Sequence, residues 1–148
     1  MKTTIHRIAA AAMALLMAGV ATANNWKDVD YVGDGQTGHK LDIYTPDDGQ
    51  STHKVVVLIY GSAWFSNNSK GDAFKSYGQQ LLDAGFAVVS INHRASTEAK
   101  FPAQIQDVKA AIRYVRGNAS KYGLDTSFIG ITGYSSGGHL SSLAGTTN

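Results

Sequence analysis

The sequence contains no cysteine and only two prolines in 148 residues. Without cysteine the chain has no disulfide, no thiol nucleophile and no cysteine-bound zinc, so its stability must come from a hydrophobic core. The sequence also lacks internal repeats, low-complexity tracts and linker-like segments. These absences exclude repeat architectures and disulfide-rich scaffolds, and they leave one domain at most.

A long apolar run is missing as well, because the run at residues 8–20 is too short to span a membrane comfortably. Lys2 and Arg7 precede this run, and the small-x-small site Ala-Thr-Ala follows it at residues 21–23. This arrangement is typical of a secretory signal peptide. We predict a signal peptide over residues 1–23, cleavage after Ala23, a mature chain over residues 24–148 and a secreted or periplasmic location. A retained membrane anchor is the alternative, which the short run and the absence of a lipid-accepting cysteine both disfavour.

The mature chain has no excess charge of either sign. Removing Lys2 and Arg7 from the 13 basic residues leaves as many basic as acidic residues, of which there are 11. Charges of both signs are interspersed, as on an ordinary soluble surface, and no basic block remains. We therefore expect no nucleic-acid partner. We also expect no stable membrane insertion after signal removal, no cofactor and no metal site.

Strand-like and helix-like segments alternate along the mature chain. Residues 54–60 and 86–92 are apolar without alternation, as in strands buried on both faces. Residues 101–117 carry apolar side chains at three- and four-residue steps, as in an amphipathic helix. This order predicts an α/β fold with a doubly wound, mostly parallel sheet, helices on both faces and an antiparallel edge. The other predicted strands are residues 29–32, 39–44 and 128–132, and the other predicted helices are residues 74–84 and the segment after residue 135.

Residues 129–140 contain the pattern Gly-x-Ser-x-Gly between an apolar β-branched run and a helix-compatible segment. A strand, a sharp turn and a helix in this order form a nucleophile elbow, with Ser135 exposed at its tip. Gly133 and Gly137 are the small neighbours that let the strand and the helix approach closely. The Ser136 amide is expected at the helix N-terminus, where unpaired N–H groups favour a negative oxygen. We predict Ser135 as a nucleophile and the Ser136 amide as half of an oxyanion hole; a chance match to five residues is the alternative.

The sequence offers no clear general base for Ser135. In a nucleophile-elbow fold the partners follow the serine in the order Asp or Glu, then His. His139 is the only histidine after Ser135 in the sequence, and no acidic residue follows Ser135. His139 lies four residues along the same helix, where it is poorly placed to take the serine proton. We expect His39 and His53 at the surface and His93 in a loop near the cleft.

Three blocks of sequence carry a resemblance to a known family. Residues 60–64 (Tyr-Gly-Ser-Ala-Trp) resemble its His-Gly-Gly-x-Trp segment. Residues 92–94 (Asn-His-Arg), with Phe-Pro-Ala at 101–103 and Asp-Val-x-x-Ala at 107–111, resemble its Tyr-Arg-Leu and Phe-Pro-Ala…Asp-Val-x-x-Ala segment. Residues 133–140 resemble its elbow, Gly-x-Ser-Ala-Gly-Gly-His-Leu. The chain thus resembles the N-terminal half of an α/β-hydrolase of the esterase and lipase kind, in particular the branch that includes carbohydrate-ester deacetylases and feruloyl esterases.

The resemblance implies roles for four further residues. It places the second oxyanion amide in the loop at Ser62 and Ala63, which replace glycines of the family. A backbone N–H does not depend on the side chain, so these replacements preserve the role; a plain strand-end turn is the alternative. The resemblance also implies that Arg94 and Asp107 form a structural charge pair between the loop after the second buried strand and the next helix. Solvation of both residues at the surface is the alternative.

The implied activity is that of a serine hydrolase that cleaves carboxylic esters by acyl transfer to water, with a carbohydrate-type ester as the favoured substrate. Acetyl-xylan, feruloyl and simple short-chain esters all stay open. A peptidase of the same fold and a catalytically inactive, hydrolase-like binding module are the alternatives. The resemblance further implies a fold that is incomplete at the C-terminus. We therefore expect the chain of 148 residues to be inactive and marginally folded on its own.

Overall fold

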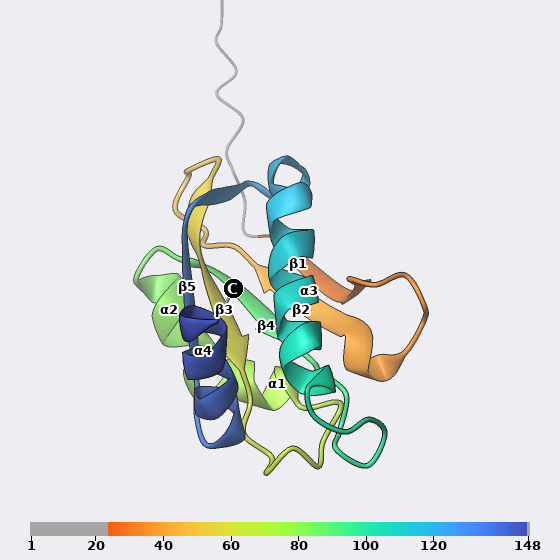
Figure 1. Ribbon diagram of the computed structural model, residues 1–148. Coiled ribbons are helices and arrows are strands. Elements are labelled where there is room, and N and C mark those ends of the chain that lie inside the picture. The colour runs from red at the N-terminus through yellow and green to blue at the C-terminus, as the bar shows by residue number, and fades with distance from the viewer. Residues whose placement is uncertain (1–23, 148) are drawn as a thin grey trace, which may run out of the picture.

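A single five-stranded sheet organises the fold. The computed structural model describes residues 24–147, so the predicted signal peptide lies outside the described residues. The strand order is β1-β2-β4-β3-β5, and β2 alone runs against the other strands of the described chain (Figure 1). The strands are β1 (Asn25–Asp30), β2 (Lys40–Tyr44), β3 (His53–Ile59), β4 (Ala87–Ile91) and β5 (Leu124–Gly133).

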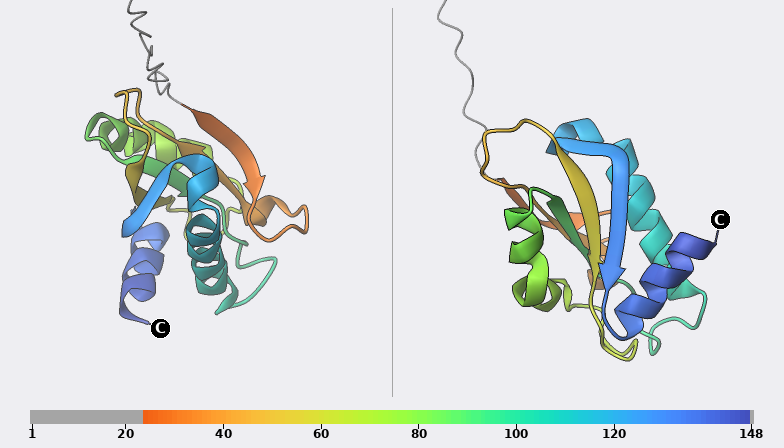
Figure 2. Two further views of the ribbon diagram at one scale, coloured as in Figure 1. Left: turned by 90° about the horizontal axis from the view of Figure 1, so that it is seen from above. Right: turned by 90° about the vertical axis from the view of Figure 1, so that its left-hand side faces the viewer.

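Helices cover both faces of this sheet (Figure 2). The connection from β3 to β4 carries α1 and α2 on one face, whereas the connection from β4 to β5 carries α3 on the other. α4 follows β5 and contacts α3 on that second face. The predicted doubly wound α/β fold is therefore confirmed. The helices are α1 (Lys70–Ala73), α2 (Gln79–Asp83), α3 (Ala103–Gly117) and α4 (Ser136–Thr146); a π-helical turn (Phe74–Gly78) joins α1 to α2, and two short 3-10 turns lie at Thr37–His39 and Ala119–Tyr122.

The interior strand β3, which lies between β4 and β5, is buried on both faces. Val55, Val57 and Ile59 belong to the core beneath α3 and α4, and the intervening Leu58 belongs to a second core beneath α1 and α2. Each of these four side chains is 0% exposed. A strand covered on both sides needs apolar residues at every position, which explains the unbroken apolar run in the sequence.

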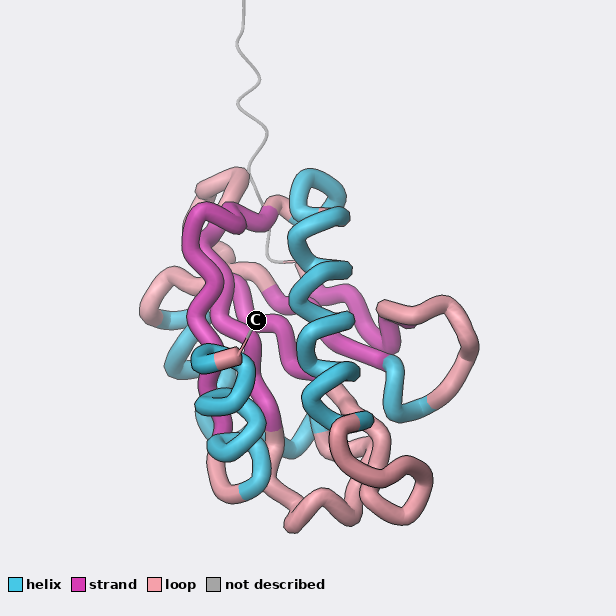
Figure 3. The backbone as a smooth tube through the Cα atoms, viewed as in Figure 1, coloured by secondary structure: helices cyan, strands magenta, loops and turns pink. Residues whose placement is uncertain are grey.

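The carboxyl ends of β3 and β5 meet where the chain reverses its direction of winding. From β3 the chain moves outward to β4, then crosses back to β5 on the opposite side of β3. Ile59 pairs with Gly133 at the ends of these two strands. Figure 3 shows the loops after β3 and β4 and the start of α4 gathered at this end of the sheet. In open α/β sheets, ligands bind outside the carboxyl ends of the strands at such a switch point.

Three predicted starts differ from the structure by four residues. The strand predicted at residues 128–132 begins at Leu124, as β5. The strand predicted at residues 29–32 lies earlier, as β1 (Asn25–Asp30). The sequence pattern missed its start because most side chains of this edge strand are polar and partly exposed, so apolar and polar residues do not alternate clearly. The helix predicted from residue 74 begins at Lys70. Lys70 is only 8% exposed, and its ammonium nitrogen lies 3.0 Å from Oδ1 of the buried Asp42. A buried lysine with a partner in a distant strand leaves no apolar signal in the local sequence.

Candidate active site

Ser135 occupies a sharp turn between β5 and α4. Its backbone has φ of 53° and ψ of −126°, a conformation that residues with a side chain rarely adopt. Ser135 is exposed, whereas Ser136, the first residue of α4, is 2% exposed. The turn therefore presents Ser135 to solvent and places the Ser136 amide at a helix N-terminus, where the helix dipole favours negative charge.

Gly133 and Gly137 stand where β3, β5 and α4 converge. A Cβ on Gly133 would lie 2.6 Å from the carbonyl oxygen of Ile59. A Cβ on Gly137 would lie 2.3 Å from the same oxygen and 2.5 Å from the carbonyl oxygen of Tyr60. Backbone atoms in a packed core cannot move aside as the end of a flexible side chain can. The glycine spacing of the elbow therefore has a steric cause.

The loop after β3 is in direct contact with the elbow. A Cβ on Gly61 would lie 2.6 Å from the carbonyl oxygen of Tyr134 and 2.7 Å from Cβ of Ser135. Further along the loop, Ala63 and Trp64 have φ of 49° and 63°. This left-handed region costs a residue with a side chain roughly 1–2 kcal/mol relative to glycine. The loop thus has a strained backbone two and three residues after its contact with the elbow.

The predicted oxyanion residues differ in what their amides bind. The Ser62 N–H donates a hydrogen bond of 2.9 Å to Oγ of Ser136. The amides of Ala63 and Ser136 have no hydrogen-bond partner among residues 24–147. Of the three predicted amides, only that of Ser62 is therefore already engaged in a hydrogen bond within the described residues.

Two stacked rings support the loop after β3. Tyr60 and His93 are both 0% exposed, and their ring centroids lie 4.7 Å apart with an interplanar angle of 21°. The Tyr60 hydroxyl donates to the carbonyl oxygen of Ser66, 3.0 Å away in that loop. His93 Nδ1 lies 2.9 Å from the carbonyl oxygen of Arg94, so Nδ1 carries the ring proton. Burial lowers the pKa of His93 and raises the pKa of Tyr60, which keeps both rings neutral.

Arg94, whose side chain is partly exposed, forms an ion pair with the buried Asp107. Arg94 Nη2 lies 2.7 Å from Oδ1 of Asp107, and the Arg94 backbone N–H donates to Oδ2 over 2.9 Å. The hydrogen bonds that the Arg94 side chain donates to the Asp107 carboxylate hold the pKa of Arg94 above its ordinary value. Asp107 Oδ1 also lies 3.3 Å from Nε2 of His39, whose Nδ1 lies 2.8 Å from Oδ2 of Asp34. The cluster joins the loop after β4 to α3 and to the β1–β2 connection.

Comparison with known proteins decides the family. The family model described as BD-FAE matches residues 41–148, which contain both the loop after β3 and the elbow. The chain belongs to the BD-FAE family. The predicted resemblance to an α/β-hydrolase of the esterase type is confirmed by this match and by the relatives that follow.

Relatives of this BD-FAE chain include solved structures. The bifunctional GH43-CE protein of Bacteroides eggerthii is 70% identical, with a TM-score of 0.83, over 84% of this chain and 17% of its own. A truncated form of a carbohydrate esterase from gut microbiota is 59% identical, with a TM-score of 0.84, over 88% of this chain and 46% of its own. The probable carboxylic ester hydrolase LipM of Mycobacterium tuberculosis is 43% identical over 81% of this chain and 28% of its own length. The chain therefore spans less than half of each of these relatives.

Two histidines of this BD-FAE chain that we expected at the surface are buried. His39 and His53 are each 5% exposed, so that expectation was wrong. Each ring pairs with an aspartate five residues earlier in the sequence: His39 with Asp34 at 2.8 Å, and His53 with Asp48 at 2.9 Å. A carboxylate partner offsets the desolvation of the ring. The repeated Asp-to-His spacing is the sequence signal that was missed.

His139 faces the aromatic end of the loop after β3. Its ring lies edge-on to that of Trp64, with the centroids 5.4 Å apart. With Phe101 and Leu140, these rings line a hollow of about 290 Å³ beside the start of α4. This largely apolar hollow is lined from α4, which begins directly after Ser135, and from the loop after β3.

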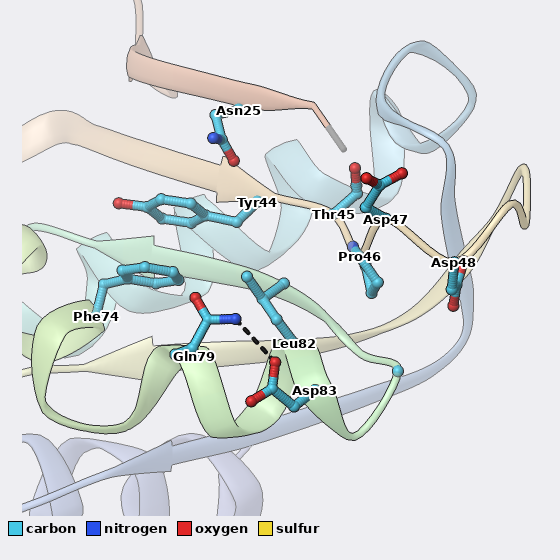
Figure 4. A pocket seen from close by; sticks show the side chains of 11 residues that line it. Asn25, Tyr44, Thr45, Pro46, Asp47, Asp48, Phe74, Gln79, Leu82 and Asp83 are labelled. Carbon is cyan, nitrogen blue, oxygen red and sulfur yellow. Dashed lines mark hydrogen bonds between the residues drawn. The ribbon is translucent and has the colours of Figure 1, made fainter. Parts of the chain in front are cut away.

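A larger hollow of about 490 Å³ lies elsewhere in the BD-FAE chain (Figure 4). Tyr44 and Phe74 line it, and Tyr44 pairs with Val88 near the start of β4. The hollow therefore lies at the opposite end of the sheet from Ser135, and we assign it no part in the site. Within residues 24–147, no helix is long and apolar enough to cross a bilayer, and no group of three or more His, Asp or Glu side chains is placed to hold a metal ion.

Proposed function

We propose that the protein is a serine esterase that cleaves carboxylic esters by acyl transfer to water. The observation that carries this proposal is the placement of Ser135. It is an exposed serine at positive φ, at the carboxyl end of β5 and beside the switch point of the sheet. The printed names of the relatives, a carboxylic ester hydrolase and a carbohydrate esterase, support the same chemistry.

In the proposed mechanism, Ser135 Oγ attacks the carbonyl carbon of the ester and forms a tetrahedral intermediate. A histidine base takes the serine proton and then passes it to the leaving alcohol. The Ala63 and Ser136 amides donate hydrogen bonds to the oxyanion as it forms. Water then attacks the acyl-enzyme, which releases the carboxylic acid and restores the Ser135 hydroxyl.

The histidine base and its acid partner are not assigned to residues of this chain. His139 is the one histidine after Ser135, and its ring packs edge-on against Trp64. In this fold the acid and the histidine both follow the nucleophile in sequence. We propose that residues 24–148 supply the nucleophile and the oxyanion amides of a larger catalytic unit and are inactive by themselves.

For the substrate class we propose carbohydrate esters. The support is the identity of 70% to the bifunctional GH43-CE protein and of 59% to the gut carbohydrate esterase. The acyl group is left open between acetyl, feruloyl and short aliphatic chains. A panel of these three ester types on the same oligosaccharide distinguishes them by kcat/KM.

The proposal is tested by turnover together with covalent labelling. The material is the natural full-length protein and a chimera in which residues 24–148 replace the matching segment of the gut carbohydrate esterase. We expect hydrolysis of acetylated xylo-oligosaccharides, and a fluorophosphonate that loses fluoride as it bonds to Ser135 Oγ. Mass spectrometry should place the adduct on Ser135 and leave Ser142, an exposed serine of α4, unmodified. Cleavage of peptides without esters would support the peptidase, and a protein that neither turns over nor labels would be a binding module.

We also propose that the protein is secreted or periplasmic, with residues 1–23 removed as a signal peptide. The support is the basic start, the apolar run and the Ala-Thr-Ala site in the sequence. When the protein is expressed with its own leader in a secreting host, the exported form should begin at Asn24. N-terminal sequencing checks this expectation, and exported material that retains Met1 would contradict it.

A further inference from the structure

Besides packing, one hydrogen bond among the described residues joins the loop after β3 to the elbow, and the hydroxyl oxygen of Ser136 accepts it. We infer that Ser136 is a positioning residue: its Oγ holds the Ser62 amide and thereby sets the place of the neighbouring Ala63 amide in the oxyanion hole. This inference rests on the proposed esterase function. It concerns the side chain of Ser136, whereas the proposed mechanism uses only the backbone N–H of that residue.

The bond between the two segments has an ordinary length and is partly buried. The Ser62 N–H lies 2.9 Å from Ser136 Oγ, and Ser136 is 2% exposed. Among residues 24–147, it is the one hydrogen bond that joins residues 61–65 to residues 133–137. A hydrogen bond shielded from water is harder to replace by solvent than an exposed one, so it fixes the geometry of the groups that make it.

The other backbone hydrogen bonds of the strained loop are made away from the elbow. The Phe65 N–H donates to the Ser62 carbonyl oxygen at 2.9 Å, within the loop itself. The Trp64 carbonyl oxygen accepts from the Ser96 N–H at 2.8 Å, which ties the loop to the segment after β4. Neither bond joins Ala63 or its neighbours to the elbow. Because Ala63 is held at φ of 49°, it needs such a restraint to stay in place.

The position of Ser136 in the motif gives the hydroxyl a distinct role. The family pattern that residues 133–140 resemble has alanine at the position of Ser136. The family pattern that residues 60–64 resemble has glycine at the position of Ser62. Here the Ser136 hydroxyl oxygen accepts the hydrogen bond of the Ser62 N–H. The oxyanion hole is therefore formed by the amides of Ala63 and Ser136. An oxyanion hole stabilises the transition state only when its donors lie at hydrogen-bond distance from the developing negative charge. With two amides in the hole, displacement of either one should therefore lower the rate.

The test compares Ser136→Ala with Ser141→Ala in the natural full-length protein and in the chimera. Ser141 is the matched control because it is also buried in α4, and its hydroxyl donates to the Gly137 carbonyl oxygen at 2.8 Å, away from the loop. Ser136→Ala should lower kcat about 10-fold and leave KM within about 2-fold, since the lost contact acts on the transition state. It should also speed hydrogen exchange of the Ser62 amide about 10-fold or more. Ser141→Ala should change neither quantity.

The two readouts separate failure of this inference from failure of the proposed function. Unchanged exchange at the Ser62 amide would overturn the inference, even in a protein with no activity. Faster exchange with an unchanged kcat would also overturn the positioning role and leave the esterase proposal standing. An equal loss of kcat in Ser136→Ala and Ser141→Ala would mean that both changes loosen α4 in general. That result would also overturn the positioning role of Ser136. If the unaltered protein and the chimera hydrolyse no ester, the proposed function fails and the catalytic role of Ser136 fails with it.

Discussion

Replacing Ser135 with alanine is expected to lower kcat for ester hydrolysis by about 1,000-fold or more. The Ser135 oxygen forms the bond to the acyl group, and the next hydroxyl in the turn cannot substitute for it. Ser136 is buried, and its Oγ already accepts the Ser62 N–H. Stability should change by no more than about 0.5 kcal/mol, because Ser135 is exposed and alanine lacks only its oxygen.

Hydrolysis of a nitrophenyl acetate by the full-length protein and the chimera measures this effect. Ser142→Ala is the matched control, an exposed serine on the same helix, and should keep the activity of the parent. Thermal unfolding of each variant separates loss of chemistry from loss of fold. If Ser135→Ala retained activity within roughly tenfold of the parent, another nucleophile would have to carry the reaction.

Replacing Gly137 with alanine should lower the free energy of unfolding by about 3 kcal/mol, near the upper end for an overpacked core. The new Cβ would lie 2.3 Å from the Ile59 carbonyl oxygen and 2.5 Å from that of Tyr60. Relief requires α4 to move away from the end of β3. That movement would also displace Ser135, so activity should fall together with stability.

The matched control is Gly145→Ala, on the same helix. A Cβ on Gly145 would meet nothing within 4 Å. This variant should be as stable as the parent or up to about 1 kcal/mol more stable, because alanine favours a helix over glycine. Urea unfolding of both variants gives the comparison. A Gly137→Ala protein within about 0.5 kcal/mol of the parent would mean that the elbow can relax around a side chain.

The sequence predicts the parts of the site that depend on neighbouring residues. The elbow is local: Gly133, Ser135 and Gly137 lie within five positions, and the steric demand on each glycine acts through β3, whose apolar run is itself plain in the sequence. The fold class follows from the same kind of signal, because fully buried strands and amphipathic helices leave periodic patterns. These predictions needed no knowledge of which side chains meet.

The features that escaped prediction depend on contacts between distant residues. The bond from Ser62 to Ser136 joins positions 74 apart, and the contact between His39 and Asp107 joins positions 68 apart. Nothing in either local segment reveals the partner. Lys70 was missed for the same reason, because a charge is tolerated in the interior only where an opposite charge meets it.

The winding order also sets when the reactive centre can assemble during synthesis. β3 and β4 can pair as soon as both have left the ribosome, but β5 emerges more than thirty residues after β4 ends. Until β5 emerges, the loop that contains Ala63 cannot contact the elbow, and one edge of β3 is unpaired. Parallel pairing of this kind is slow because a long loop must close first. The nascent chain therefore exposes an apolar strand edge before it has a positioned serine, and a chaperone that covers this edge would act before the site exists.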